Sequence, residues 1–138
     1  MNLIEIFTLI IGHYVADFIL QDVKWANNKS TSNKALLMHT LTYASFWLIL
    51  ALSINVYVNV TTGHWAFNVW AVQMFVLYTF ILHTATDYIT SRIVKNKFKK
   101  QEYGTSLPNT GAFSVIGFDQ VLHYLQLFLT YEFLINEK

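Results

Sequence analysis

The sequence contains no cysteine, a single proline and few charged residues. The lack of cysteine excludes disulfide bonds and thiolate metal sites, so any transition metal must be held by histidine and carboxylate side chains. Charged residues make up 12% of the chain, against roughly 25% in typical soluble domains. The net charge of +1 argues against a polyanionic partner, and no nucleic-acid partner is expected.

Apolar residues take the place of the missing charges. Hydrophobic residues make up 54% of the 138 residues, and aromatic residues make up 17%. A soluble chain of this length would keep too much of its surface in water to bury so many apolar side chains, whereas lipid removes this conflict. Aromatic side chains also anchor helices at the two membrane interfaces. The composition therefore predicts an all-α integral membrane protein that forms a single domain, with the lipid bilayer as its surroundings.

Four apolar segments are long enough to cross a hydrocarbon core of about 30 Å at ~1.5 Å per residue. They run approximately over residues 3–20, 35–60, 65–91 and 112–135, which predicts a bundle of about four transmembrane helices. We expect the first segment to be retained rather than cleaved as an export signal. No basic residue precedes it and no small-residue cleavage site follows it.

The basic residues predict how these helices are oriented. Eight of the nine Lys and Arg residues lie in the first and third connections, residues 21–34 and 92–111, whereas the short second connection has none. In a four-helix serpentine these two connections share one side, which the positive-inside rule places in the cytoplasm. Both termini are then expected outside. The third connection is expected to be a turn-rich loop around Pro108, with residues 111–118 as a shallow interfacial segment.

Ionisable side chains inside the apolar segments carry the main functional signal, because each costs a few kcal/mol in a membrane and usually marks function. Most fall in His–Asp pairs spaced i, i+4, which places both side chains on one face of a helix. In the predicted topology all of them reach a similar depth near the cytoplasmic side. The candidate metal ligands are His13, Asp17, His39, His83, Asp87, Asp119 and His123.

Four histidines and three aspartates suit zinc or manganese as the cofactor. They could hold two ions about 3.5–4 Å apart, or one ion whose histidine ligands are oriented by carboxylates. A bound ion could activate a water molecule for hydrolysis. Asp17, Gln21 and Tyr43 are the candidates for orienting substrate or moving protons. A phosphoester or lipid-headgroup substrate would suit the nearby basic residues, so the favoured interpretation is a metal-dependent hydrolase.

Three other interpretations remain open. The polar cluster can act only as interhelical hydrogen bonding that holds the bundle together. It can also pass protons or divalent ions, and because the chain is short a carrier of this kind would need a homo-oligomer. In the last interpretation the chain is a phage or bacterial membrane interaction protein, in which the connection at residues 92–111 matters more than the histidines.

Several short motifs resemble those of a known family. They are H-x3-D-F-x2-Q at residues 13–21, L-L-x-H at residues 36–39 and D-Q-x2-H at residues 119–123. Together with Trp25, Lys34, Tyr43, His83 and Asp87, they resemble a family of small bacterial and phage membrane proteins of unknown function over nearly the whole chain. A looser similarity links the chain to membrane-bound metal-dependent hydrolases, which place His and Asp at helix ends facing the cytoplasm. The H-R-G-x-T-H-S element of those hydrolases is missing here.

Overall fold

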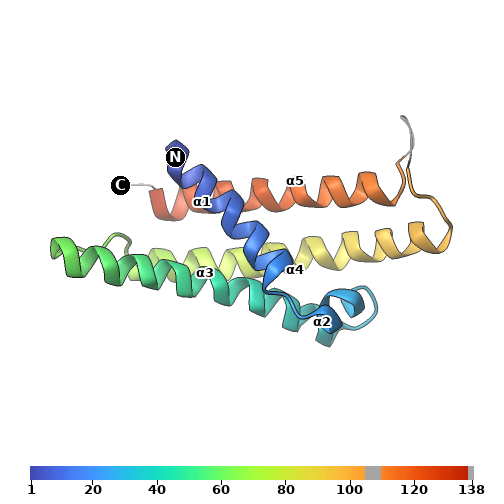
Figure 1. Ribbon diagram of the computed structural model, residues 1–138, viewed down its shortest axis with the longest axis horizontal. Coiled ribbons are helices and arrows are strands. Elements are labelled where there is room, and N and C mark those ends of the chain that lie inside the picture. Colours follow the sequence, from blue (N-terminus) through green and yellow to red (C-terminus); the bar gives the residue numbers. More distant parts are fainter. Residues whose placement is uncertain (105–109, 137–138) are drawn as a thin grey trace.

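The computed structural model describes residues 1–104 and 110–136, and within them every regular element is a helix. The elements, shown in Figure 1, are α1 (Leu3–Tyr14), η1 (Val15–Ile19, a π-helical turn), α2 (Val23–Asn28), α3 (Asn33–Thr62), α4 (Val69–Lys99), α5 (Ala112–Tyr131) and η2 (Glu132–Asn136). The predicted all-α class is therefore confirmed.

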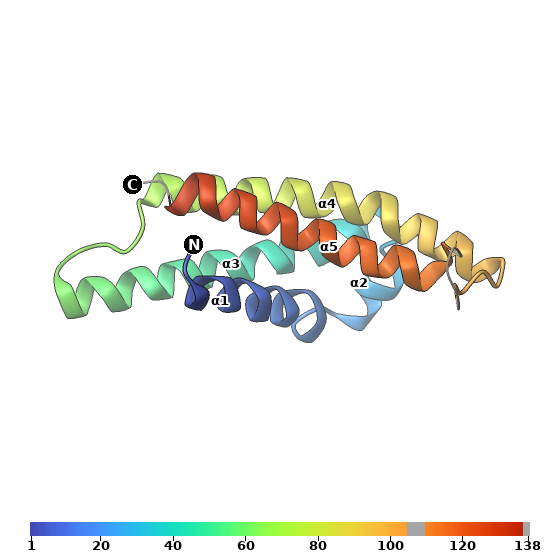
Figure 2. The ribbon, with the colours of Figure 1, turned by 90° about the horizontal axis from the view of Figure 1, so that it is seen from above.

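The long helices form an antiparallel bundle. α3, α4 and α5 run side by side along the length of the molecule, and α1 crosses them obliquely (Figures 1 and 2). Three segments are long and apolar enough to cross a membrane, namely α3, α4 and residues 112–135. The first predicted segment, residues 3–20, is formed by α1 and η1, which are shorter and are not among these three. The chain passes back and forth, so the first and third connections share one end, at the right of Figure 1. We call this end the basic end.

α1, α3 and α4 begin at polar side chains that accept hydrogen bonds from the first turn, as N-caps do, whereas α5 begins after Gly111 without a side-chain cap. Asn2 and Glu5 form a reciprocal capping box on α1. The Ser32 hydroxyl accepts from the backbone amide of Ala35 at the start of α3, and the Asn68 side chain caps α4. α3 ends at Gly63, whose φ of 75° is a left-handed conformation that favours glycine.

The connection between α4 and α5 is shorter than predicted. α4 continues to Lys99, because Lys and Arg are good helix formers and basic side chains are favourable in the last turn of a helix. α5 begins directly at Ala112 with Gly111 as its N-cap, so residues 112–118 belong to this helix and are not a separate interfacial segment. Gly111 lies against Gly104 with no room for a side chain. The turn predicted around Pro108 lies outside the described residues.

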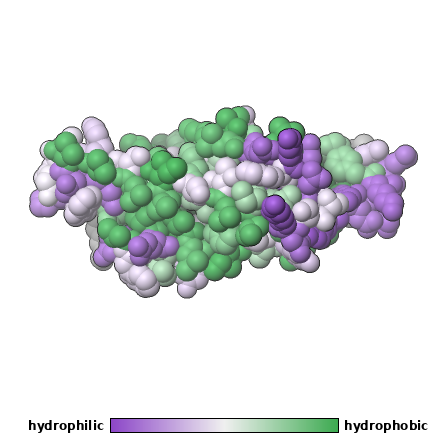
Figure 3. Space-filling view, turned by 90° about the horizontal axis from the view of Figure 1, so that it is seen from below, coloured by the Kyte–Doolittle hydropathy of each residue, from purple (hydrophilic) through white to green (hydrophobic). Residues whose placement is uncertain are grey.

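The surface is apolar along much of the bundle. Figure 3 shows hydrophobic side chains over the middle of one face and hydrophilic ones gathered toward the basic end. Large apolar side chains are exposed on each long helix, among them Ile49, Tyr78 and Val121. Soluble monomers rarely expose so much contiguous apolar surface, whereas a lipid-facing surface is expected to be apolar. The exposed surface therefore agrees with a membrane protein.

Candidate metal centre

All seven candidate ligands lie inside the bundle, each with 8% or less of its surface exposed. They come from all four main helical segments. The structure arranges six of them in three overlapping groups, and in each group the donor atoms lie within 4.8 Å of one another. These groups are Asp17, His39 and His83; His13, Asp17 and His123; and His83, Asp87 and His123. The predicted convergence of the pairs is thus observed, and their role as ligands stays a prediction.

Two histidines face the same two carboxylates in what we call the central site, formed by Asp17, His39, His83 and Asp87. His39 Nε2 lies 3.1 Å from Asp17 Oδ1 and 3.0 Å from Asp87 Oδ2. His83 Nε2 lies 3.6 Å and 3.5 Å from the same two oxygens. The two imidazole nitrogens are 3.4 Å apart.

These separations match those between the ligands of a four-coordinate ion. Ligand bonds of about 2.0–2.1 Å place the donor atoms of a tetrahedral site about 3.3–3.4 Å apart. The five measured separations, from 3.0 to 3.6 Å, lie on both sides of that value. Asp17, His39 and His83, whose donor atoms all lie within 4.8 Å of one another, therefore have donor types and spacing that suit a zinc-like ion, and Asp87 Oδ2 lies beside both histidines.

Asp17 reaches the central site from an irregular turn. Residues Val15–Ile19 form a π-helical turn in which the amide of Leu20 donates to the carbonyl of Val15 at 2.9 Å. Such turns are frequently found at functional sites. Within this turn Asp17 is buried, whereas Phe18 and Ile19, which follow it, are exposed.

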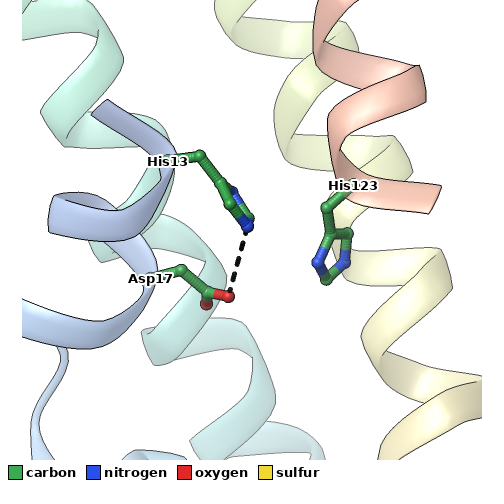
Figure 4. A group of neighbouring side chains, drawn as sticks. All are labelled: His13, Asp17 and His123. Atoms are coloured by element: carbon green, nitrogen blue, oxygen red, sulfur yellow. Dashed lines mark ion pairs between the residues drawn. The ribbon is translucent and has the colours of Figure 1, made fainter. Parts of the chain in front are cut away.

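His13, Asp17 and His123 form a second group, which we call the lateral site. Figure 4 shows His13 and Asp17 on one side of a gap and His123 facing them from α5. His13 Nε2 lies 3.9 Å from Asp17 Oδ2. The His123 ring stacks on His83 with ring centroids 4.1 Å apart, which connects the lateral site to the central one. Asp119 lies beside this group, with Oδ2 3.7 Å from His123 Nδ1.

Lys29 is a member of the cluster that the sequence did not indicate. Its Nζ donates to both oxygens of Asp87, at 2.9 Å and 2.8 Å, and lies 3.3 Å from His39 Nε2. Burial lowers the pKa of the Lys29 ammonium, but the carboxylates of Asp87 and Asp17 outweigh burial and hold the pKa above its usual value. A lysine in a polar connection carries no sequence signal that separates it from its neighbours Lys24 and Lys34.

Other polar side chains hold the histidine rings in place. The Tyr43 hydroxyl lies 2.9 Å from His13 Nδ1, and its ring stacks on His83 with centroids 4.0 Å apart. Gln120 Oε1 lies 3.0 Å from His13 Nε2. Tyr43 is fully buried and fixes both rings, so its contacts indicate a positioning role. The predicted role of Tyr43 in moving protons stays a prediction.

A cavity of about 370 Å³ adjoins the cluster at the basic end, and we call it the polar cavity. Residues from η1, the first connection, the second half of α4 and the first half of α5 line it. Its ionisable and amide side chains are Asp17, Gln21, Asn27, Lys29, Asp87, Lys95, Asp119 and Gln120. The predicted catalytic candidates Asp17 and Gln21 are thus both at the cavity, whereas Tyr43 is not among its lining residues.

Aromatic side chains cover the opposite side of the cluster. Tyr43 packs edge to face on Trp47 with centroids 6.2 Å apart, and Trp47 packs on Phe75 at 5.9 Å. These three residues belong to the buried apolar cluster that includes Leu9 and Leu127. The polar cavity and the aromatic layer therefore lie on opposite sides of the histidines.

Fold and site together define the class: an α-helical membrane protein whose interior holds histidine and aspartate groups able to bind a metal ion. The chain belongs to the family described as protein of unknown function (DUF3307), which it matches over residues 6–138. This match confirms the resemblance to an uncharacterised family, and it does not extend to the metal-dependent hydrolases. No curated protein and no solved structure matches the chain.

Proposed function

We propose that the protein binds a divalent transition metal ion, zinc or manganese, in the central site and uses it to hydrolyse a phosphoester. The observation that carries this proposal is the spacing around His39 and His83, whose Nε2 atoms lie 3.4 Å apart and 3.0–3.6 Å from one oxygen each of Asp17 and Asp87. Two nitrogen and two oxygen donors suit zinc and also manganese.

The charges of the cluster also support one resident divalent ion. Asp17, Asp87 and Asp119 contribute three negative charges when ionised, and Lys29 contributes one positive charge. The sum is −2, which one divalent ion brings to zero. Uncompensated charge inside a membrane bundle is expensive, so a neutral sum favours binding.

The polar cavity supports hydrolysis as the reaction. When bound, a divalent ion polarises a phosphoryl oxygen and lowers the pKa of a water molecule to about 7. Lys29 and Lys95 line the same cavity and supply positive charge for an anionic substrate. Asp119 lines it as well and can accept a proton, while the Gln21 amide can orient a phosphate oxygen. With the basic end in the cytoplasm, the substrate would be a phosphoester or a lipid headgroup on that side.

The aromatic layer argues against ions passing straight through the bundle. A channel requires a continuous polar route on both sides of its binding site. Here Tyr43, Trp47 and Phe75 pack against one another on the side away from the polar cavity. This packing is expected of a site that exchanges reactants through one end of the bundle.

Metal analysis of the protein purified in detergent tests the proposal. We expect about one zinc or manganese ion per chain, lost in the variants His39→Gln and His83→Gln, since each removes one of the four donors. The control is His64→Gln, because His64 is exposed at the other end of the bundle. Circular dichroism checks that each variant keeps its helices. Equal metal content in the unaltered protein and in all three variants would reject the central site.

Hydrolysis is tested on the same preparations with para-nitrophenyl phosphate and with vesicles that contain a phosphomonoester lipid. Phosphate release should require the metal, disappear in His39→Gln and His83→Gln, and remain in His64→Gln. A fully metal-loaded protein that releases no phosphate from either substrate would reject the hydrolase and leave metal binding intact.

A further inference from the structure

Two histidines of the cluster are not used by the central site. His13 and His123 face each other across the gap shown in Figure 4, and together with Asp17 they bring three donor atoms within 4.8 Å of one another. All three side chains are buried, with exposed fractions of 0%, 2% and 4% for His13, His123 and Asp17. Their donor types and spacing are those of a second metal site.

His123 is the side chain that points most directly to a ligand. Neither of its ring nitrogens has a hydrogen-bond partner among the described residues, although the ring is almost fully buried. A buried polar group without a partner typically costs about 1–3 kcal/mol. The stacking of His123 on His83 holds the ring but does not satisfy its nitrogens. An ion in the lateral site would supply the missing partner.

Asp17 is placed to serve both sites. Its Oδ1 faces His39 and His83 in the central site, and its Oδ2 is the oxygen nearer to His13 in the lateral site. One carboxylate whose two oxygens point into different donor groups can bridge two ions. Ions in two-metal hydrolytic sites lie about 3.5–4 Å apart.

The surroundings of His13 also suit a metal ligand. If Nε2 binds the ion, the proton resides on Nδ1 and is donated to the Tyr43 hydroxyl 2.9 Å away. Such a second hydrogen bond is the usual way in which a ligating histidine is oriented. Gln120, now 3.0 Å from His13 Nε2, also lines the polar cavity, so its amide has room to turn aside.

Charge predicts when the second ion binds. One ion in the central site brings the sum of Asp17, Asp87, Asp119 and Lys29 to zero, so a second divalent ion would leave +2. A phosphate group carries about −1.5 to −2 near neutral pH and would restore neutrality. The adjacent polar cavity, with Lys95 in its lining, has room for such an anion.

Building on the proposed function, we propose that His13, Asp17 and His123 form a second divalent-cation site, bridged to the central site by Asp17. This site fills together with a phosphate-type anion in the polar cavity. The hydrolytic centre would then carry one resident ion and a second ion that arrives with the substrate.

The test is a manganese titration of the detergent-purified protein with and without inorganic phosphate. Bound ions are counted by elemental analysis, and electron paramagnetic resonance detects an exchange-coupled manganese pair. We expect one ion without phosphate, and two ions with the coupled spectrum in its presence. His123→Gln and His13→Gln should each bind one ion under both conditions, whereas His64→Gln should behave as the unaltered protein.

The outcomes separate the two proposals. One ion under both conditions in the unaltered protein would overturn the lateral site and leave the central site standing. No bound ion under either condition would overturn the central site itself. Two ions without phosphate would overturn the coupling to an anion. Two ions with phosphate in His123→Gln would overturn the assignment of the second ion to the lateral site.

Discussion

At the scale of single residues, Lys29 has the largest consequence for metal binding. Its ammonium group donates to both oxygens of Asp87 and lies 3.3 Å from His39 Nε2. These are the same atoms that would hold an ion in the central site. A tethered cation and a divalent ion therefore compete for the same donors, and binding of the ion requires Lys29 to move toward the polar cavity.

Removing this competing charge should strengthen metal binding. We expect Lys29→Gln to bind zinc at least tenfold more tightly, a gain of about 1.4 kcal/mol, because the ion no longer displaces an ion pair or meets a like charge. The measurement is competition with a chromogenic chelator. Lys34→Gln is the matched control, since Lys34 is exposed in the nearby first turn of α3. Equal or weaker affinity in Lys29→Gln would show that Lys29 does not compete with the ion.

The effect of Lys29→Gln on zinc affinity should not depend on pH near neutrality. The nearby carboxylates hold its pKa above the usual value of 10.5. Because this pKa is raised, the ion pair between the Lys29 ammonium and the carboxylates is fully present below the usual pKa. It is lost only as the pH rises through the higher pKa of the folded protein. The affinity ratio between Lys29→Gln and the unaltered protein is therefore expected to stay constant from about pH 6 to 9.

At the scale of helices, the regular part of the site follows from sequence and the irregular part does not. The spacing of His83 and Asp87 fixes both side chains on one helix face, because the periodicity of an α-helix is set by its backbone. The π-helical turn at Val15–Ile19 has no such local cause. Its Asp17 side chain lies against His39 on α3 and His83 on α4, and these contacts exist only after the helices have packed.

Close packing of α1 against α3 gives a test at this scale. A Cβ on Gly12 would lie 2.6 Å from the Trp47 ring, so Gly12→Ala must push the ring aside. We expect a loss of about 1–3 kcal/mol in the free energy of unfolding, as for other overpacked cores. Thermal unfolding in detergent should then show a lower midpoint. Because Gly12 precedes His13, metal affinity should fall as well.

Gly117→Ala is the control for this substitution. Gly117 lies within α5, and nothing is within 4 Å of a Cβ built there. Alanine should be neutral or stabilise the protein by up to about 1 kcal/mol, because it favours the helix. If the midpoint of Gly12→Ala were as high as that of Gly117→Ala, the tight contact between Gly12 and Trp47 would be ruled out.

At the scale of the whole molecule, the basic residues predicted which connections lie together. The structure confirms that the first and third connections share one end of the bundle (Figure 1). The end that faces the cytoplasm is a separate matter, because it is decided during insertion by charges flanking the helices and not by contacts within the bundle. The cytoplasmic position of the polar cavity is therefore a prediction that needs its own measurement.

The lack of cysteine makes this measurement direct, because any introduced thiol is the only one in the chain. Val23→Cys places an exposed thiol at the basic end, and His64→Cys places one in the connection at the other end. In intact bacterial cells, a membrane-impermeant maleimide should label position 64 at once and position 23 only after permeabilisation. The reverse pattern would place the polar cavity outside the cytoplasm. Its substrate would then have to be an extracytoplasmic phosphoester, even if the metal chemistry were unchanged.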